Sequence, residues 1–174
     1  IVRGIEGSAS SDERYDAIVR ALDEYGLPQR RWTWTGEYTL ETGVAAGTAL
    51  ANLHVKERPT AVITTCEFSA YGLIEGASRH GLTVPEQLSV VGYDNTAFAE
   101  VFRPALTVIA QPIEEMVTLA VDSILRMIVE NTEPQLPPVA PVAGTMQYRT
   151  VTKKVEDAVL STFLIKRNST AVSP

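Results

Sequence analysis

The chain has 174 residues, 45% of them hydrophobic, with 21 acidic and 15 basic residues and a formal net charge of −6. This length and hydrophobic content predict one compact α/β domain, or one domain with part of another, and the negative charge excludes the basic surface that binds a nucleic-acid backbone. Because Cys66 is the single cysteine and every apolar run stops well short of the roughly 20 residues that span a bilayer, we expect no internal disulfide, no membrane partner and a cytoplasmic location.

Strand-like and helix-like segments alternate from the start of the chain. The first residue is Ile1 and no secretion leader follows it, so we interpret the start as a cut within a longer protein. In chain order the patterns predict strands at residues 2–6, 31–35, 61–65 and 88–92 and helices at residues 12–25, 40–54 and 68–80. This alternation is typical of a parallel sheet with helices on its faces.

Two of the predicted helices carry signals at their ends. Ser10 and Glu13 have the spacing of a capping box at the start of the first helix. Gly26 and Gly81 stand where the first and third helices should end in a left-handed residue. Both kinds of signal support the predicted boundaries.

The pattern changes after residue 92. An irregular segment at 93–104 precedes a strand at 106–110 and the clearest helix of the chain, at 113–130. Seven apolar residues form one face of this helix: Met116, Val117, Ala120, Val121, Ile124, Leu125 and Ile128. We expect the apolar surface that covers them to lie in sequence upstream of Ile1.

The last part of the chain is less regular. Residues 131–143 contain four prolines and have the composition of an extended connector. A hairpin-like pair of strands, at 145–152 and 159–166, follows before a polar tail.

Polar side chains follow each of the first four predicted strands, and the carboxyl ends of parallel strands meet at one edge of a sheet, where ligands bind. These groups are residues 8–11 with Arg14, Glu37 with Tyr38, Cys66 with Glu67, and Tyr93 with Asp94 and Asn95. Arginine and aspartate can each engage two neighbouring hydroxyls, and an aromatic ring can cover the apolar face of a sugar. The pattern therefore predicts a site for a polyol or a related small molecule.

Each of these groups also has a structural alternative. Asp94 could lie in a strand-ending turn, and Arg14 could be a solvated surface charge. Tyr38 could pack on the edge of the sheet. Cys66 could be a small buried hydrophobe, and Glu67 could be a favourable charge at a helix N-terminus.

Catalysis and cofactors have little support in the sequence. His54 and His80 fall at the far ends of their helices, so neither can serve Cys66 as a general base, and a small α/β enzyme would need such a partner. Gly4 and Gly7 complete no nucleotide-binding loop, and no histidine or cysteine spacing suits a metal. We therefore expect a protein that is not an enzyme and uses no metal or cofactor.

Residues 58–112 carry a dense set of motifs. P-T-A precedes an apolar strand, A-x-G lies in the next helix, G-x-x-V-P precedes the following strand, and V-V-G-Y-D is followed by P-x-L-T and Q-P. Together with ERYDAIVRAL upstream and FLIKRNSTA downstream, these motifs strongly resemble the lactose-repressor (LacI/GalR) family of transcription regulators. One departure is Ala17, which stands where the family usually has a glycine in its R-x-x-G helix.

The resemblance implies a periplasmic-binding-protein-like effector domain, in which two subdomains close over a small molecule, usually a sugar, nucleoside or related metabolite. The matched positions imply effector contacts by five side chains: Arg14, Tyr38, Asp94, Gln111 and Ser10. Cys66 and Glu67 occupy a further contacting position, where the family usually has an N-D pair, so the effector need not be a simple galactoside.

The resemblance also implies the domain layout, a three-layer α/β sandwich with an open parallel sheet that holds one subdomain and part of the second. We expect residues 1–105 and 156–174 to form the C-terminal effector-binding subdomain and residues 106–130 to be part of the opposite, N-terminal subdomain. Residues 131–155 are expected to form a proline-rich connector and hairpin insertion. A homodimer is expected through one apolar surface, made of Leu40, Tyr71, Phe98, Val101 and Phe102.

The implied mechanism is not catalytic. Effector binding favours one orientation of the subdomains and so changes the spacing of two DNA-binding heads in a dimer. Operator DNA is expected to bind only through an N-terminal helix-turn-helix that is absent from this chain. The alternative is an exported, periplasmic-type sugar-binding protein of a transport system, which shares the same sheet and binding site.

Overall fold

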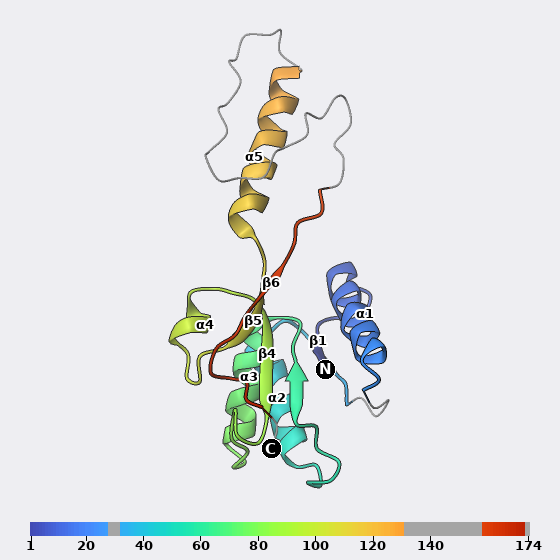
Figure 1. Cartoon of the computed structure of the whole chain (residues 1–174), viewed down its shortest axis with the longest axis vertical. Helices are drawn as coiled ribbons and strands as arrows, with labels where there is room; N and C mark the ends of the chain where they lie inside the picture. Colours follow the sequence, from blue (N-terminus) through green and yellow to red (C-terminus); the bar gives the residue numbers. More distant parts are fainter. Residues whose placement is uncertain (28–31, 131–157, 173–174) are drawn as a thin grey trace. The chain divides into compact units, whose positions relative to one another are not determined.

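The computed structural model describes residues 1–27, 32–130 and 158–172, and the chain divides into two units (Figure 1). The first unit comprises Ile1–Gln111 with Thr162–Pro174, and the second comprises Pro112–Ser161. Every residue predicted to bind a ligand lies in the first unit.

Strands and helices alternate in the first unit, as the sequence predicts. Its strands are β1 (Val2–Arg3), β2 (Trp34–Thr35), β3 (Ala61–Ile63), β4 (Ser89–Asp94), β5 (Thr107–Ala110) and β6 (Phe163–Ile165). Its helices are α1 (Ala9–Glu24), α2 (Leu40–Ala51), α3 (Glu67–Ser78) and α4 (Phe98–Val101). Most strands are shorter than predicted, and α4 lies in the segment predicted to be irregular.

The strands form an open sheet. β1 pairs in parallel with β2, and β3, β4 and β5 pair in parallel in that order. A parallel bridge between Val2 and Thr64, with Thr65 N donating to Val2 O at 2.9 Å, joins β1 to the end of β3. β6 runs antiparallel to β5, so the sheet is mixed at this edge rather than parallel throughout.

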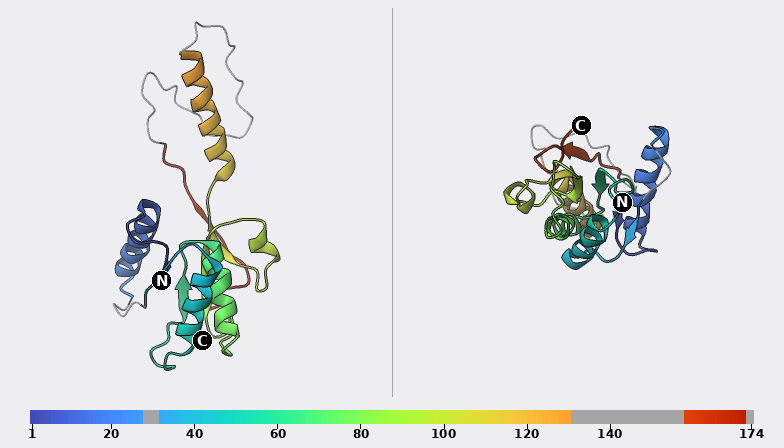
Figure 2. Two further views of the ribbon diagram at one scale, coloured as in Figure 1. Left: turned by 180° about the vertical axis from the view of Figure 1, so that it is seen from behind. Right: turned by 90° about the horizontal axis from the view of Figure 1, so that it is seen from below.

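Helices cover both faces of this sheet. Val2 is fully buried in the core with Leu50 of α2 and Leu73 of α3, whereas its neighbour Arg3 forms an ion pair with Asp12 of α1. Because successive side chains of a strand point to opposite faces, α1 lies on the face opposite to α2 and α3. Figure 2 shows α2 and α3 side by side, with α1 apart from them. The predicted three-layer arrangement is therefore confirmed.

Glycines let α2 and α3 approach each other closely. They are Gly43 and Gly47 on α2 and Gly72 and Gly76 on α3. A Cβ atom at Gly43 would lie 2.8 Å from the Cα atom of Gly72, and a Cβ atom at Gly47 would collide with the backbone oxygen of Leu73. No larger residue fits this contact without moving a helix.

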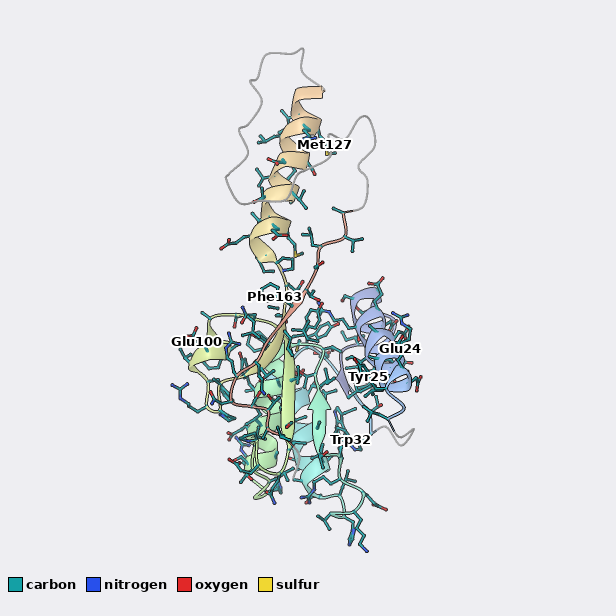
Figure 3. All side chains as sticks on the ribbon, viewed as in Figure 1. Glu24, Tyr25, Trp32, Glu100, Met127 and Phe163 are labelled. Atoms are coloured by element: carbon teal, nitrogen blue, oxygen red, sulfur yellow. The ribbon has the colours of Figure 1, made fainter. Side chains whose placement is uncertain are left out.

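The segment that follows β6 is hydrogen-bonded to two strands. The fully buried Ser169 donates its hydroxyl to Val90 O at 2.6 Å and accepts a bond from Thr107 N at 2.8 Å. Phe163, labelled in Figure 3, pairs with Ala110 of β5. The strand predicted at 159–166 is therefore shorter and pairs with β5. Its predicted partner at 145–152 and the connector at 131–143 lie outside the described residues.

In the second unit the structure describes α5 (Ile113–Glu130), which confirms the predicted helix, and residues 158–161. The unit boundary corrects one prediction. Residues 106–111 belong to the first unit rather than to an opposite subdomain, because Thr107–Ala110 pairs with β4 and extends its sheet. The assignment of α5 to an opposite subdomain stays a prediction. Within the ranges described, no helix is both long and apolar enough to cross a membrane.

The start of α1 also differs from the prediction. Its N-cap is Ser8, without a side-chain cap bond, and Ser10 lies inside the first turn, so the capping box is wrong. Asp12 accepts a bond from Gly7 N at 3.4 Å, so its carboxylate contacts the turn that precedes the helix. Gly26 and Gly81 have φ values of 63° and 77°, the left-handed conformation that was predicted.

Candidate functional site

Arg14 of α1 reaches across to the carboxyl ends of two strands. Its Nη1 donates to Thr65 O, just after β3, at 2.7 Å, and its Cζ lies 4.0 Å from the centre of the Tyr93 ring in β4. Its Nη2 lies 4.0 Å from Asp94 Oδ1. A carbonyl, a ring face and a carboxylate therefore hold the guanidinium in one place.

Asp94, the last residue of β4, is the second charged member of the cluster. Gln111 Nε2 donates to its Oδ1 at 2.6 Å, so the amide of Gln111, just after β5, orients the carboxylate. The backbone φ of Asp94 is 107° and that of Asn95 is 75°, values that residues other than glycine seldom adopt. The Asp94 side chain is 34% exposed and that of Arg14 is 22% exposed, so both can still contact a ligand.

Tyr38 and Ser10 add two hydroxyls near the end of β1. Their oxygens lie 3.4 Å apart. The Tyr38 ring rests on Gly4, where any Cβ atom would collide with it, so glycine makes room for the ring beside the strand. The role of Tyr38 as an aromatic that covers a sugar stays a prediction.

The Cys66 side chain caps a helix in the structure. It is the N-cap of α3, and its Sγ accepts a bond from Ser69 N at 3.4 Å and lies 3.2 Å from Ser69 Oγ. The thiol is 5% exposed, which agrees with the structural alternative of a small buried side chain.

Glu67 also has partners within the chain. It is 1% exposed, and its two carboxylate oxygens accept bonds from Thr96 N at 2.8 Å and from Thr96 Oγ1 at 2.6 Å. Its carboxylate thus ties the start of α3 to the turn after β4. The structural alternative considered for Glu67, a favourable charge at a helix N-terminus, did not include that contact, because Thr96 lies 29 residues away in sequence.

The residues predicted for the dimer surface fall into two groups. Phe98 and Val101 are 53% and 62% exposed, and Leu40 at the start of α2 is 45% exposed. Tyr71, in contrast, is 3% exposed, and its ring lies 4.6 Å from that of Phe102, so these two rings pack on each other within the chain. The α4 loop thus folds back in part on α3.

One exposed aromatic of this surface was missed. Phe68 is 59% exposed, and its ring makes an edge contact with Tyr71 at 6.4 Å between centroids. Its spacing of three residues from Tyr71 on the predicted helix was the available signal, since residues three apart are neighbours on a helix surface.

The two histidines make their contacts away from the cluster of Arg14, Asp94 and Gln111. His80, just after α3, has its Nδ1 2.9 Å from Gly76 O of that helix, and His54 Nδ1 accepts a bond from Lys56 N in the loop that follows α2. Among the residues that the structure describes, no group of histidine, cysteine and carboxylate side chains could hold a metal ion.

An arginine, a carboxylate and an amide therefore meet at the carboxyl ends of β3, β4 and β5, and two hydroxyls contact each other near the end of β1. This set can donate to and accept from the hydroxyl groups of a small molecule, and its opposite charges offset each other.

Comparisons with known proteins identify the family of the chain. The chain matches the model of the periplasmic binding protein-like domain over residues 2–151. The HTH-type transcriptional repressor PurR of Glaesserella parasuis is 34% identical over 142 residues, which cover 81% of this chain and 41% of that protein. The probable HTH-type transcriptional repressor ExuR of Bacillus subtilis is 31% identical over 131 residues, covering 75% of this chain and 39% of that protein.

Two solved structures of transcription regulators are also similar to this chain in fold. A transcription regulator from Lactobacillus plantarum superimposes with a TM-score of 0.74 at 25% identity, covering 98% of this chain and 58% of that one. A LacI family regulatory protein from Chloroflexus aggregans gives a TM-score of 0.68 at 29% identity, covering 77% and 48%.

The chain therefore belongs to the periplasmic binding protein-like domain family. Within that family it is an effector-binding region of the lactose-repressor (LacI/GalR) type. It spans about two fifths of the length of the curated relatives named above.

Proposed function

We propose that this chain is the sensing region of a transcription repressor and that it binds a small, neutral, polyhydroxylated or nucleoside-like effector. The observation that carries the proposal is the cluster of Arg14, Asp94 and Gln111. Asp94 accepts from Gln111 at 2.6 Å, Arg14 is held by Thr65 O at 2.7 Å, and both charged side chains remain partly exposed. Tyr38 and Ser10 supply the remaining contacts.

The charges of the cluster favour a neutral ligand. Arg14 faces the carboxylate of Asp94, so neither charge is left to attract an ion of the opposite sign. Hydroxyl groups can use both, because each hydroxyl donates to a carboxylate and accepts from a guanidinium. A LacI family regulator from Lactobacillus casei, similar to this chain in fold at 23–24% identity, has been solved with bound glucose and with bound sucrose. Sugars are therefore the first ligands to test.

The proposed mechanism needs no chemical step, and the named relatives are repressors rather than enzymes. The effector favours one orientation of two subdomains because it binds that orientation more tightly. In a homodimer this changes how two DNA-binding heads, outside this chain, meet operator DNA. Such a protein works in the cytoplasm. The names of the relatives favour this reading over an exported sugar-binding protein.

The proposed dimer surface is the exposed apolar patch of Leu40, Phe68, Phe98 and Val101. These four side chains are 45%, 59%, 53% and 62% exposed and come from α2, α3 and α4. Exposed apolar side chains of this kind are typical of a protein interface, and a twofold axis would bring the same residues of two chains together.

The test is titration calorimetry of the full-length parent protein against glucose, sucrose, pentoses and purine bases, and against hexuronates, which are anions and should not bind. With the ligand that binds, we expect Asp94→Ala and Arg14→Ala each to weaken binding by about 2 kcal/mol or more, since each leaves a polar partner unpaired. The matched controls are Asp16→Ala and Arg20→Ala, two exposed positions on α1 that should bind normally. Normal binding by both site variants would refute the assignment of the site.

A further inference from the structure

Arg167, two residues beyond β6, lies against the turn that follows β4. Its Nη2 donates to Asn95 Oδ1 at 2.8 Å, and its Nη1 donates to Leu106 O at 2.8 Å. Its backbone N donates to Thr107 Oγ1 at 2.9 Å. One planar guanidinium therefore links the Asn95 side chain to the backbone that leads into β5.

The turn that Arg167 contacts is strained. Asp94 and Asn95 have consecutive φ values of 107° and 75°. Such values are uncommon for residues with a side chain and persist where the surroundings impose them. On one side the turn is held by Glu67, which accepts two bonds from Thr96. On the other side it is held by Arg167.

We propose that Arg167 is a positioning residue for the ligand site. By bonding Asn95 in its left-handed conformation, it fixes the direction of the neighbouring Asp94 carboxylate toward Gln111 and Arg14. Arg167 itself need not touch the ligand. The relevance of this role to binding rests on the proposed function, but the role itself can be measured without any ligand.

A lysine cannot replace this arginine fully. The two acceptors, Asn95 Oδ1 and Leu106 O, are met by two different nitrogens of one rigid plane. An ammonium group is a single point of donation on a flexible stem, so it fixes the two acceptors less well relative to each other. We therefore expect Arg167→Lys to be intermediate between the wild type and Arg167→Ala.

The first test uses the side-chain amide of Gln111 as a reporter in ¹⁵N-edited NMR spectra of the ligand-free chain, because this amide bonds Asp94. Arg167→Ala should shift or broaden that signal and the backbone signals of Asp94 and Asn95. Adding Asn95→Gly should restore narrow signals for Asp94 and Gln111, because glycine adopts positive φ without steric cost and no longer needs the arginine. A purely structural loosening of the C-terminal segment would not be repaired by a glycine at residue 95.

The matched control is Arg58→Ala. Arg58 also clamps backbone oxygens, those of Ala51 and Leu53 at 2.6 and 3.1 Å, but it lies at the opposite end of β3. This variant should leave the Gln111 amide signal in place. The proposal is overturned if Arg167→Ala leaves the Gln111, Asp94 and Asn95 signals unchanged, or if adding Asn95→Gly fails to restore the signals of Gln111 and Asp94.

The second test measures affinity in the full-length protein with whichever member of the panel of glucose, sucrose, pentoses, hexuronates and purine bases binds. Arg167→Ala should raise Kd about fivefold or more, and the double variant with Asn95→Gly should recover most of the loss. Unchanged affinity together with a displaced Gln111 signal would overturn the link to binding and the assignment of Asp94 as a ligand contact, while the positioning role itself would stand.

Discussion

At the scale of single residues, the buried phenol of Tyr71 lies near the buried carboxylate of Glu67. Burial, together with the Glu67 carboxylate nearby, raises the pKa of Tyr71 above its ordinary value of about 10. Within the described part of the chain, the Tyr71 hydroxyl has no hydrogen-bond partner of good geometry. The folded state thus holds this phenol in its neutral form.

This predicts a specific loss of stability in alkali. A group whose pKa is raised in the folded state contributes its full stabilisation below its unfolded pKa, about 10 for tyrosine, and loses it as the pH rises toward the folded pKa. We expect the free energy of unfolding to fall between pH 9 and pH 11 more steeply in the wild type than in Tyr71→Phe. Urea denaturation at several pH values across that range measures the free energy of unfolding of both proteins. Tyr25→Phe is the control, since Tyr25 is 82% exposed (Figure 3), and equal slopes for the wild type and Tyr71→Phe would contradict the expectation.

At the scale of elements, the contact of α2 with α3 is the least tolerant part of the fold. Four glycines place the two backbones so close that a methyl group has no space. Gly47→Ala improves the intrinsic helix propensity of α2, yet the new Cβ atom meets the backbone oxygen of Leu73 rather than a flexible side chain. The free-energy cost of overpacking the helix contact should therefore exceed the gain from the higher helix propensity of alanine.

We expect Gly47→Ala to destabilise the chain by about 1 to 3 kcal/mol, because the helices must separate to accept the methyl group. Chemical denaturation of the variant and the wild type measures this difference in the free energy of unfolding. Ala45→Ser also adds one heavy atom to α2, but at an exposed position, and should change stability by less than about 0.5 kcal/mol. Similar stability of the Gly47→Ala variant and the wild type would show that the helix contact can expand freely.

The sequence predicts elements better than contacts between them. The order of strands and helices and the meeting of Arg14 with Asp94 follow from local patterns and from the topology of parallel sheets, whereas Gln111 was implied only by the resemblance to the lactose-repressor family. Glu67 could not be assigned in this way, because its partner Thr96 lies in a turn whose path depends on the rest of the sheet. For the same reason the sequence did not reveal the contact of Arg167 with Asn95, 72 residues apart.

At the scale of the whole molecule, the structure changes which residues should be mutated to test association. Phe102 packs on Tyr71 within the chain, so an aspartate at residue 102 would disturb the fold as well as any interface. Phe98 and Val101 are more than half exposed and make cleaner probes. An aspartate at residue 98 or at residue 101 would place a charge within the proposed patch.

We expect the double variant Phe98→Asp, Val101→Asp to convert a dimer of the full-length protein into a monomer, because burying two unpaired carboxylates costs several kcal/mol. Light scattering measures the mass. Val55→Asp is the control, since Val55 is 71% exposed and lies in the loop after α2, and this variant should stay dimeric. A double variant that remained a dimer would place the interface elsewhere.

The position of β6 has a consequence for how the protein is made. β5 leaves the ribosome some fifty residues before the strand that completes its edge, and the bonds from Ser169 to Val90 and Thr107 can form only when the tail has emerged. Until then the nascent polypeptide carries an edge strand with free backbone donors and acceptors, the state from which chains pair wrongly with one another. A truncated chain that ends before residue 162 would stay in this state, so it should be bound by chaperones or degraded rather than accumulate in folded form.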